Sequence, residues 1–567
     1  ARQPRFTTDS EILGNRRGDL MLLINGMPLI HIELKASNHH VSEACNQIEK
    51  YMKLGVFTGF FSLVQMFVAM TPEETVYFAN PGRPGTFNPD DHGTFNPDDQ
   101  FHWADFNNNP MNNWEDIARN FLSIPMAHQM IGYGMVADGA DNTLKIMRSY
   151  QYYAAIKVYA RAIDENVWDA HKQEGGYVYH TTGSGKTLTS FKCAQLIASS
   201  KKVDKIVFLM DRTELWKQTF IKYRGFAVSE QVDDVTSTRD LIAKLCSGTG
   251  PEDDSSQLIV ASIQKMSRIT IENGANPLDV QKIQKKRIVF IIDEAHQDVA
   301  GEMLAGIKRT YKNALFFGFT GTPIKPENAI NGITTQGLFG ECLHSYNILN
   351  GIRDKNVLGF KTFKISTFDE NELKEIVAKQ KSGVTDVAAA SDEQFATYRT
   401  WMQKSMLEIE KELDRNIYRE GMSGKKHRQA VVDSILENWD IQSNRGQFHQ
   451  ILATSSISEA IEYYDLFASN DKGLFVTAIF DPSTDLSEGD TWKEDAIARI
   501  LTDYNRRFGF KYNVASYKNF KDDVCSRLAH IEPYKFLDRN RADAVNIVIV
   551  VNQLLTGFDS KWIDVLN

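Results

Sequence analysis

A glycine-bearing loop at residues 180–187 carries groups that could bind a nucleotide. It reads His-Thr-Thr-Gly-Ser-Gly-Lys-Thr and follows a short apolar run. Successive loop amides, together with a helix that begins at Lys186, make a positive site for phosphate. The Lys186 ammonium can reach the β- and γ-phosphates, and the Thr187 hydroxyl can bind Mg²⁺. The strict motif has glycine where this chain has His180, so a chance turn rich in glycine and serine is the alternative.

Further residues suited to nucleotide chemistry follow apolar runs downstream. After Arg287, residues 288–292 are apolar throughout, as in a central parallel strand, and Asp293-Glu-Ala-His296 comes directly after them. Ligands bind at the carboxyl ends of such strands. We therefore expect Asp293 to hold Mg²⁺ and Glu294 to activate the attacking water. With the loop, the expected nucleotide contacts are Thr182, Gly183, Ser184, Gly185, Lys186, Thr187 and Asp293.

Two carboxylates and an ammonium gather near the N-terminus. Asn25-Gly26 predicts a hairpin between residues 19–24 and 28–35, which brings Asp19 nearly opposite Glu33. Lys35 shares the face of Glu33 because side chains alternate along a strand. Asp19 and Glu33 could hold Mg²⁺, and Lys35 could steady developing phosphate charge. Solvated charges at the end of a surface hairpin are the alternative.

These residues resemble two known families. Asp19, Glu33-Leu-Lys35 and, on the expected helix 41–53, Gln47 and Tyr51 are similar to the catalytic pattern of RecB-like nucleases. That family often has proline before the aspartate, where this chain has Gly18. The phosphate loop with Asp-Glu-Ala-His resembles superfamily 2 motors. That resemblance implies adenine contact by Arg148 and Gln151, a link to the DNA side by His296, coupling of hydrolysis to domain movement by Thr320, Gly321 and Thr322, and contact with nucleotide and DNA backbone by Gly557 and Asp559.

The ordered set resembles the restriction and motor subunit of type I restriction-modification enzymes. The resemblance implies an α/β chain with a PD-(D/E)xK nuclease domain at 1–130 and RecA-like parallel-sheet motor domains at 131–345 and 346–567. It also implies ATP and Mg²⁺ as cofactors, duplex DNA as substrate, methyltransferase and specificity subunits as partners, DNA pumping, and cleavage at distant sites. One alternative is a stand-alone helicase-nuclease for DNA repair. Another is a nucleotide-gated DNA scaffold with a vestigial nuclease centre.

Size and composition fit a large protein of about three domains. The 567 residues are 42% hydrophobic and 24% charged, and the net charge of −9 excludes a uniformly basic nucleic-acid binder but not a local basic groove. The five cysteines form no C-x-x-C pair, which indicates a reducing compartment such as the cytoplasm and no zinc site. The apolar run 60–70 is too short to cross a membrane. We expect a fragment truncated at its C-terminus, because the chain stops before the motif that would supply an arginine to the γ-phosphate.

The elements that must position these residues follow from hydrophobic patterning. The charged stretch 370–447 is expected to be a mostly helical insertion, with 402–415 an amphipathic helix. The Asn-rich stretch 101–113 is expected to be a loop, as are the near-repeats 85–91 and 93–99, whose acid pairs could alternatively bind a cation. Further helices are expected at 114–122 and from Arg148 to about Glu165. Further strands are expected within 67–78 and at 205–210, 258–262, 314–319, 450–455, 474–480 and 544–551.

Overall fold

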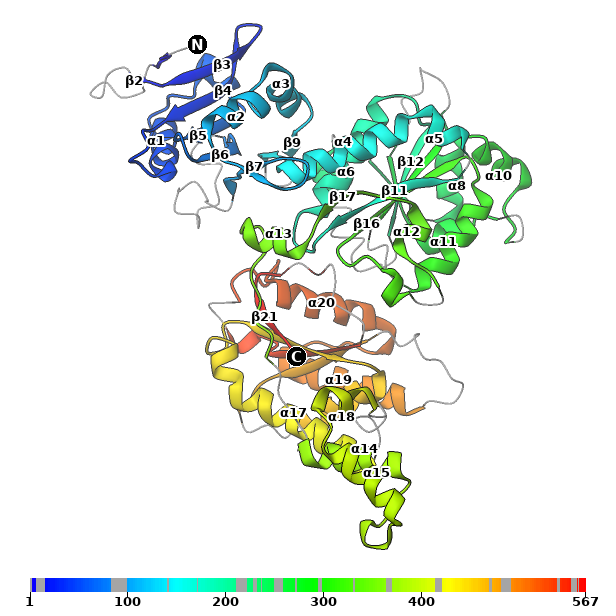
Figure 1. Cartoon of the computed structure of the whole chain (residues 1–567). Coiled ribbons are helices and arrows are strands. Elements are labelled where there is room, and N and C mark those ends of the chain that lie inside the picture. Colours follow the sequence, from blue (N-terminus) through cyan, green and yellow to red (C-terminus); the bar gives the residue numbers. More distant parts are fainter. Residues whose placement is uncertain are drawn as a thin grey trace. The chain divides into compact units, whose positions relative to one another are not determined.

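The structure is a computed structural model in which the chain forms two compact units, Ala1–Gly359 and Phe360–Asn567 (Figure 1). The described residues are 3–6, 16–82, 99–139, 142–170, 172–210, 222–227, 232–235, 237–248, 258–270, 273–293, 298–329, 332–363, 370–412, 421–468, 472–480, 491–537, 541–551, 558 and 560–567. Each unit is described by itself.

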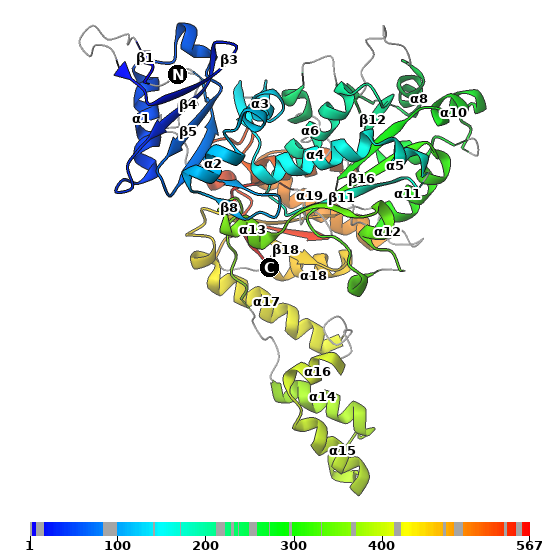
Figure 2. The same ribbon diagram turned by 45° about the horizontal axis from the view of Figure 1, so that its top comes forward.

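The first unit begins with a four-stranded sheet in the order β3-β4-β5-β6. Its strands are β3 Leu20–Ile24, β4 Met27–Leu34, β5 Met66–Met70 and β6 Thr75–Ala79. The β3–β4 and β5–β6 pairs are antiparallel, whereas β4 and β5 are parallel. Helix α1 (Val41–Lys53) lies along one face, as Figure 2 shows beside β4 and β5. Two short strands near the N-terminus, β1 (Arg5–Phe6) and β2 (Arg16–Arg17), pair with each other.

The opposite face of this sheet packs into a larger apolar core. Ile30 and Ile32 of β4 belong to one buried cluster with residues of the connecting helices and of the next sheet. The fully buried Trp103 contacts Tyr77 of β6 at 5.9 Å between ring centroids and Phe121 at 4.6 Å. The connecting elements are β7 Trp103–Ala104, β8 Pro110–Met111, α2 Trp114–Asn120, α3 Ile124–Gly132, β9 Met135–Asp138 and β10 Thr143–Ile146.

A seven-stranded parallel sheet forms the rest of the first unit, in the order β13-β14-β12-β15-β16-β11-β17. Its strands are β11 Glu174–His180, β12 Lys205–Met210, β13 Val232–Asp234, β14 Leu258–Ser262, β15 Ile288–Asp293, β16 Ala314–Thr320 and β17 Cys342–Tyr346. The helices are α4 Ser149–Ile163, α5 Glu165–Asp169, α6 Lys186–Ser199, α8 Thr238–Cys246, α9 Ile263–Ser267, α10 Pro277–Gln284, α11 Asp298–Thr310, α12 Thr335–Phe339 and α13 Ile348–Arg353. The central strands are buried throughout, as the apolar runs predicted.

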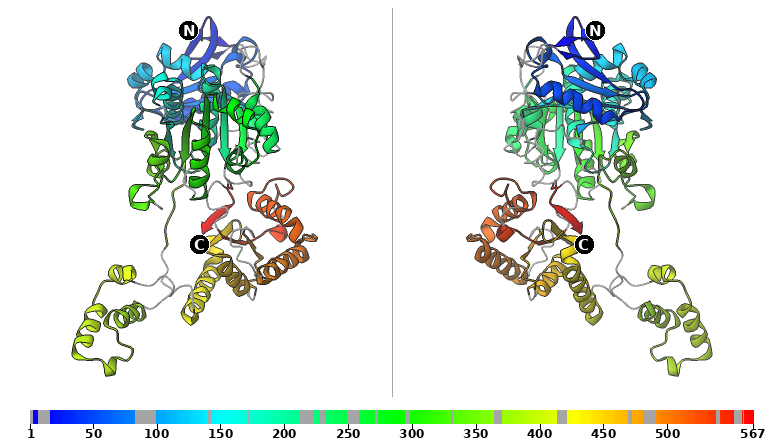
Figure 3. Two further views of the ribbon diagram at one scale, coloured as in Figure 1. Left: turned by 90° about the vertical axis from the view of Figure 1, so that its right-hand side faces the viewer. Right: turned by 90° about the vertical axis from the view of Figure 1, so that its left-hand side faces the viewer.

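The second unit holds a four-stranded parallel sheet in the order β19-β20-β18-β21. The strands are β18 His449–Thr454, β19 Val476–Ile479, β20 Ile547–Val551 and β21 Ile563–Leu566. The helices are α14 Glu370–Ser382, α15 Asp392–Met402, α16 Met406–Glu412, α17 Gly421–Gln442, α18 Ile457–Phe467, α19 Thr491–Phe508 and α20 Tyr517–Ala529. Helices α14 to α16 gather around a small core of their own, made by Leu373, Val377 and Ile409 (Figure 3).

Two expectations about these elements are wrong. The stretch 402–415 is not one helix, because α15 ends at Met402 and α16 begins at Met406, where the Ser405 amide donates to Glu408. The Asn-rich stretch 101–113 is not only loop, since it contains the β7–β8 hairpin. The domain boundary at 346 stays a prediction, and the compact second unit begins at residue 360. The near-repeats at 85–91 and 93–99 fall almost wholly outside the described residues.

Two further properties concern the cysteines and the helices of the described residues. All five cysteines are free thiols. Among the described helices, none is long and apolar enough to cross a membrane.

Candidate functional site

The first candidate site lies between strand β4 and helix α1. Alternation along β4 puts His31, Glu33 and Lys35 on the face that α1 covers, opposite the face of Ile30 and Ile32. The face used for chemistry is therefore not the face packed against the rest of the unit.

The hairpin sets Asp19 beside Glu33. Asn25 and Gly26 have φ of 49° and 82°, as a two-residue hairpin turn requires. Leu20 pairs with Ile32, so the next position along the ladder places Asp19 opposite Glu33. The Leu34 amide donates to Asp19 Oδ2 at 2.8 Å, which holds the aspartate at this end of the hairpin. The hairpin therefore brings Asp19 to the strand end that carries Glu33, whereas a joint role of the two carboxylates stays a prediction.

Glu33 is a buried carboxylate whose neighbours include a lysine and a histidine. It is 0% exposed, and neither of its oxygens accepts a hydrogen bond from a described residue. Lys35 Nζ lies 3.5 Å from one oxygen and His31 Nε2 lies 3.3 Å from the other. Burying a charge without hydrogen bonds is costly, and a cation bound beside Asp19 would offset that cost. The two carboxylates fit a divalent cation that also takes backbone and water oxygens, although no group of three or more His, Cys, Asp or Glu with metal-binding geometry occurs in the described part of the chain.

Helix α1 supplies a hydrogen-bonded chain to the same site. Lys35 Nζ donates to Gln47 Oε1 at 2.5 Å, and Gln47 Nε2 donates to the Tyr51 hydroxyl at 2.7 Å. The Tyr51 hydroxyl donates to the Arg17 carbonyl at 2.8 Å. Burial raises the pKa of Tyr51, and the negative charges of Glu33 and Asp19 raise it further. Gln47 and Tyr51 thus orient Lys35 and keep a neutral hydroxyl beside the carboxylates.

The missing side chain of Gly18 leaves room for the His31 ring. A Cβ at position 18 would lie 2.7 Å from His31 Cε1 and 2.7 Å from Phe6 Cε2. The Gly18 amide also donates to the Pro4 carbonyl at 3.0 Å, a bond that proline could not make. The departure from the proline of RecB-like nucleases is therefore matched by an imidazole that fills the space behind Glu33.

We expect Gly18→Ala to destabilise the β3–β4 hairpin, because its methyl group overpacks against His31 and Phe6 at a cost of about 1–3 kcal/mol. His31→Ala in the same chain should relieve the clash, so the two changes together should cost less than their sum. Native-state hydrogen exchange of the β4 amides measures both costs. Additive costs would contradict the shared space.

The second candidate site lies at the carboxyl ends of three adjacent strands. The order β15-β16-β11 brings Asp293, Thr320 and the phosphate loop to one edge of the sheet. Asp293 pairs with Phe319 across the ladder, and Tyr179 pairs with Thr320. The central parallel sheet thus assembles the predicted nucleotide residues without further adjustment.

The phosphate loop has the backbone that anion binding needs. Gly183 and Gly185 have φ of 80° and 82°, values that favour glycine, and α6 begins at Lys186. The Ser184 hydroxyl donates to the Thr181 carbonyl at 2.5 Å and closes the loop. Thr182 and Gly183 are exposed at its outer edge. The loop thus has the closed backbone that phosphate binding needs.

The 320–322 turn lies against this loop. A Cβ added at Gly321 would stand 2.8 Å from Thr182 Oγ1 and 3.3 Å from Lys186 Nζ. The Thr322 amide donates to Thr320 Oγ1 at 3.1 Å, which fixes the turn. Movement of this turn would therefore displace Lys186. The coupling role expected for Thr320, Gly321 and Thr322 stays a prediction.

Arg148, Tyr150 and Gln151 brace the loop from the start of α4. Gln151 Oε1 accepts from the Arg148 amide at 2.9 Å, and its Nε2 donates to the carbonyls of Ser184 and Gly185 at 3.3 and 3.2 Å. The Tyr150 hydroxyl donates to the Ser184 carbonyl at 2.7 Å. Gln151 is 3% exposed, and both ends of its amide bond to protein. Adenine contact by Gln151 and Arg148 stays a prediction, whereas their support of the loop is observed.

His180, the departure from the strict motif, pairs with His344 of β17. His180 Nε2 lies 3.0 Å from His344 Nδ1, and His344 Nε2 lies 3.2 Å from the Phe106 carbonyl. A carbonyl only accepts, so the proton of His344 lies on Nε2 and its Nδ1 is an acceptor. The proton between the two rings therefore lies on His180 Nε2, which donates to His344 Nδ1. Burial lowers the pKa of His344 to about 4 and lowers that of His180 well below its usual value. Both rings are neutral near pH 7.

The His344 pKa predicts acid sensitivity of this pair. His344 takes up a proton near pH 6.5 in the unfolded chain but only near pH 4 in the folded chain. The stability that comes from a neutral, buried His344 is therefore complete above pH 6.5 and is lost as the pH falls from 6.5 to about 4. Between pH 7 and pH 5 the loss amounts to about 2 kcal/mol. His344→Asn keeps an acceptor for His180 but does not titrate, and should remove most of this loss at the β11 amides in hydrogen exchange. His449→Asn in the second unit is the control, and an unchanged loss in His344→Asn would contradict the assignment.

Four predicted residues lie outside the described part of the chain: Glu294, His296, Gly557 and Asp559. Their roles stay predictions. The sequence analysis missed His31 and His344. The alternation His31-Glu33-Lys35 was a signal for the first, while His344 owes its position to pairing between distant segments.

Three family models match the chain. Residues 2–86 match the N terminus of the type I restriction enzyme R protein, residues 150–394 match the SWI2/SNF2 ATPase, and residues 446–567 match domain 3 of the type I restriction enzyme subunit R. The endonuclease subunit of the type I restriction enzyme SauMSSORF170P from Staphylococcus aureus is 33% identical over an alignment of 567 positions that covers 97% of this chain. The chain belongs to the R-subunit family of type I restriction enzymes.

Other R subunits and solved structures add to this comparison. The endonuclease subunit of SsaAORF53P from Staphylococcus saprophyticus is 31% identical over 97% of the chain. The chain spans 53% of the length of each of these two relatives, so about half. The Type ISP restriction-modification enzyme LlaBIII bound to DNA matches over 94% of this chain and 30% of its own, with 15% identity and a TM-score of 0.42. The helicase domain of Hef from Pyrococcus furiosus matches over 71% of this chain and 87% of its own, with 13% identity and a TM-score of 0.34.

Proposed function

We propose that this R-subunit chain hydrolyses ATP to pump duplex DNA and cuts that DNA with the carboxylate site of its N-terminal sheet. The observation that carries the proposal is the presence of two chemically different sites in one compact unit. One is a phosphate loop that lies against the 320–322 turn, and the other is a buried carboxylate beside a lysine. Residues 1–130 would be a PD-(D/E)xK nuclease domain, and residues 131–345 and 346–567 would be RecA-like motor domains. The second compact unit of the structure begins at residue 360.

The residues of the nucleotide site divide the work of phosphoryl transfer. Lys186 neutralises charge on the β- and γ-phosphates, and the loop amides hold their oxygens. Thr187 and Asp293 would hold Mg²⁺, which lowers the negative charge of the phosphates when bound. Glu294 would orient the attacking water. Gly321 packs against Thr182 and Lys186, so hydrolysis and movement of the 320–322 turn are linked.

The residues of the carboxylate site suit phosphodiester hydrolysis. Asp19 and Glu33 would hold Mg²⁺, which when bound polarises the scissile phosphate and a water. Lys35 lies 3.5 Å from Glu33 and is held by Gln47, so it can stabilise charge on the phosphate. His31 backs Glu33 from the core side. Tyr51 fixes Gln47 and thereby the lysine.

The partners follow from family membership and are part of the proposal. Methyltransferase and specificity subunits would recognise the DNA site, since no sequence-reading element is needed in a subunit that pumps duplex. Strand displacement on a forked substrate separates this function from that of a stand-alone repair helicase-nuclease. Pumping without unwinding supports the proposal, and robust unwinding overturns it.

Lys186→Ala should abolish ATP turnover and, with it, cleavage by the assembled enzyme. Loss of one charge that stabilises the transition state costs about 3–4 kcal/mol, or more than about 100-fold in rate. Phosphate release in the presence of DNA measures the effect. Lys172→Ala, an exposed lysine just before β11, is the matched control. Near wild-type turnover in Lys186→Ala would refute the assignment.

Glu33→Gln should abolish cleavage while DNA-stimulated ATP turnover remains, and Asp19→Ala and Lys35→Ala should behave in the same way. The amide keeps the shape of Glu33 but removes the charge that binds a cation. Plasmid cutting and phosphate release are measured in one reaction. Glu43→Gln on the exposed side of α1 is the control. If turnover falls together with cleavage, the carboxylates have a structural role only.

A further inference from the structure

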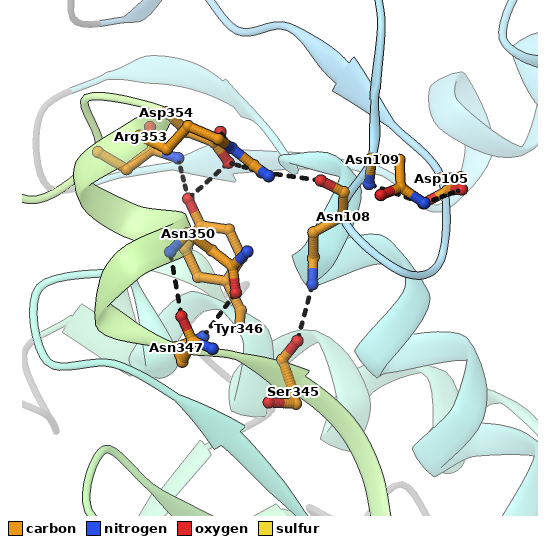
Figure 4. A network of polar contacts seen from close by, with 10 residues as sticks. Asp105, Asn108, Asn109, Ser345, Tyr346, Asn347, Asn350, Arg353 and Asp354 are labelled. Carbon is orange, nitrogen blue, oxygen red and sulfur yellow. Dashed lines mark hydrogen bonds and ion pairs between the residues drawn. The ribbon is translucent and has the colours of Figure 1, made fainter.

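We propose that Arg353 and Asn108 form a clasp that ties the N-terminal sheet to the nucleotide site, so that cleavage depends on it while ATP turnover does not. The inference rests on the proposed function and concerns how its two sites are joined. Arg353 ends helix α13, and Asn108 lies in the loop between β7 and β8 (Figure 4). Both residues are positioning residues, because neither lies in the two candidate sites.

The loop that carries Asn108 is preformed. Asp105 Oδ1 accepts from the amides of Asn107 and Asn109 at 2.8 Å each, and its Oδ2 accepts from Asn109 Nδ2 at 2.9 Å. Asn108 has φ of 63°, a left-handed conformation that asparagine tolerates better than most residues. These bonds hold the Asn108 carbonyl and amide in a fixed direction, so the clasp needs no ordering of the loop.

Two direct hydrogen bonds close the clasp (Figure 4). Arg353 NH2 donates to the Asn108 carbonyl at 2.8 Å, and Asn108 Nδ2 donates to the Ser345 carbonyl at 2.9 Å. Asn108 is 6% exposed, so its bonds are shielded from water. A buried polar group that loses its partner is penalised, which makes these bonds hard to dispense with.

The motor side of the clasp reaches the phosphate loop in two steps. Asp354 accepts from Arg353 Nε at 2.7 Å and from the Tyr346 hydroxyl at 3.0 Å. The Tyr346 ring stacks on Tyr150 at 3.7 Å between centroids, and the Tyr150 hydroxyl donates to the Ser184 carbonyl. The Tyr346 carbonyl also accepts from the Thr181 amide at 2.9 Å. A displacement of the phosphate loop is therefore passed to Asp354 and Arg353.

The sheet side of the clasp reaches β6. The loop begins after Phe101, whose backbone bonds in both directions with Tyr77 of β6 at 2.9 Å. Arg148, at the start of α4, lies 4.5 Å above the Phe101 ring. Strand β6 pairs with β5, and β5 with β4, which carries Glu33. The clasp thus joins the two sites through one loop and three strands.

The charge of Arg353 contributes little by itself, because its side chain is 42% exposed. The geometry of its guanidinium matters more, since one planar group serves both Asp354 and Asn108. Asn108→Gly keeps the left-handed backbone but loses the amide that bonds to Ser345. Both changes therefore remove clasp bonds, and the thermal midpoint of each variant measures what that removal costs in stability.

The test compares full-length R subunits in the assembled enzyme. We expect Arg353→Ala and Asn108→Gly to keep ATP turnover within about twofold of wild type, because neither residue lies in the nucleotide site. Plasmid cutting per ATP hydrolysed should fall about 10- to 100-fold, because the cutting site is misplaced relative to the pumped DNA. Arg353→Lys keeps a donor for the Asn108 carbonyl and should recover part of the loss. Arg399→Ala, an exposed arginine of α15, is the control.

The outcomes separate the clasp from the proposed function. A wild-type enzyme that does not cut in an ATP-dependent manner refutes the proposed function, whatever the variants do. A wild-type enzyme that cuts, with unchanged cutting per ATP in Arg353→Ala and Asn108→Gly, refutes the clasp. A parallel fall of turnover, cutting and thermal midpoint also refutes it, because the residues then only stabilise the fold.

Discussion

A continuous apolar core joins the N-terminal four-stranded sheet to the seven-stranded sheet, and both candidate sites depend on it. The core runs from Ile30 and Ile32 through Trp103 and Phe121 to Val178 and Phe317 without a polar break. Trp103 contacts Tyr77 of one sheet and Tyr152 of α4, the helix that braces the phosphate loop. Replacing such a buried tryptophan with alanine costs about 3–5 kcal/mol. The two sites are thus attached to one packed body, and not to two bodies joined by a hinge.

This constraint decides which surfaces are left for chemistry. Strand β4 uses its Ile30 face for the larger core, and its Glu33 face carries the carboxylate beside a second core under α1. At the other site, strand ends supply the phosphate loop and Asp293, while the strand bodies are buried. The Arg353–Asn108 clasp adds directional polar bonds to a non-directional apolar joint. Apolar contact fixes how close the sheets are, and the clasp fixes how they are turned.

Local chemistry made much of this predictable from sequence. Asn25-Gly26 specified a hairpin turn that brings Asp19 to within about one residue of Glu33, whereas the bulge between Leu22 and Leu23, which sets the final register, could not be predicted. Apolar runs predicted strands β12, β15 and β16. The polar residues after β15 and β16 predicted part of the nucleotide site. Long-range pairing was out of reach: no local pattern shows that Asn108 meets Arg353 or that His180 meets His344. The helix break at 403–405 was also missed, because hydrophobic periodicity continues across it while side-chain bonds to the backbone start a new helix.

The central claim is that the N-terminal sheet and the seven-stranded sheet open as one cooperative unit. Native-state hydrogen exchange of the full chain in increasing denaturant tests it directly. The account predicts that the slowest amides of β4 and β5 share one opening free energy and one denaturant dependence with those of β12, β15 and β16. If the β4 and β5 amides exchange through a separate opening, with lower free energy and a smaller denaturant dependence, the shared core does not unite the two sites.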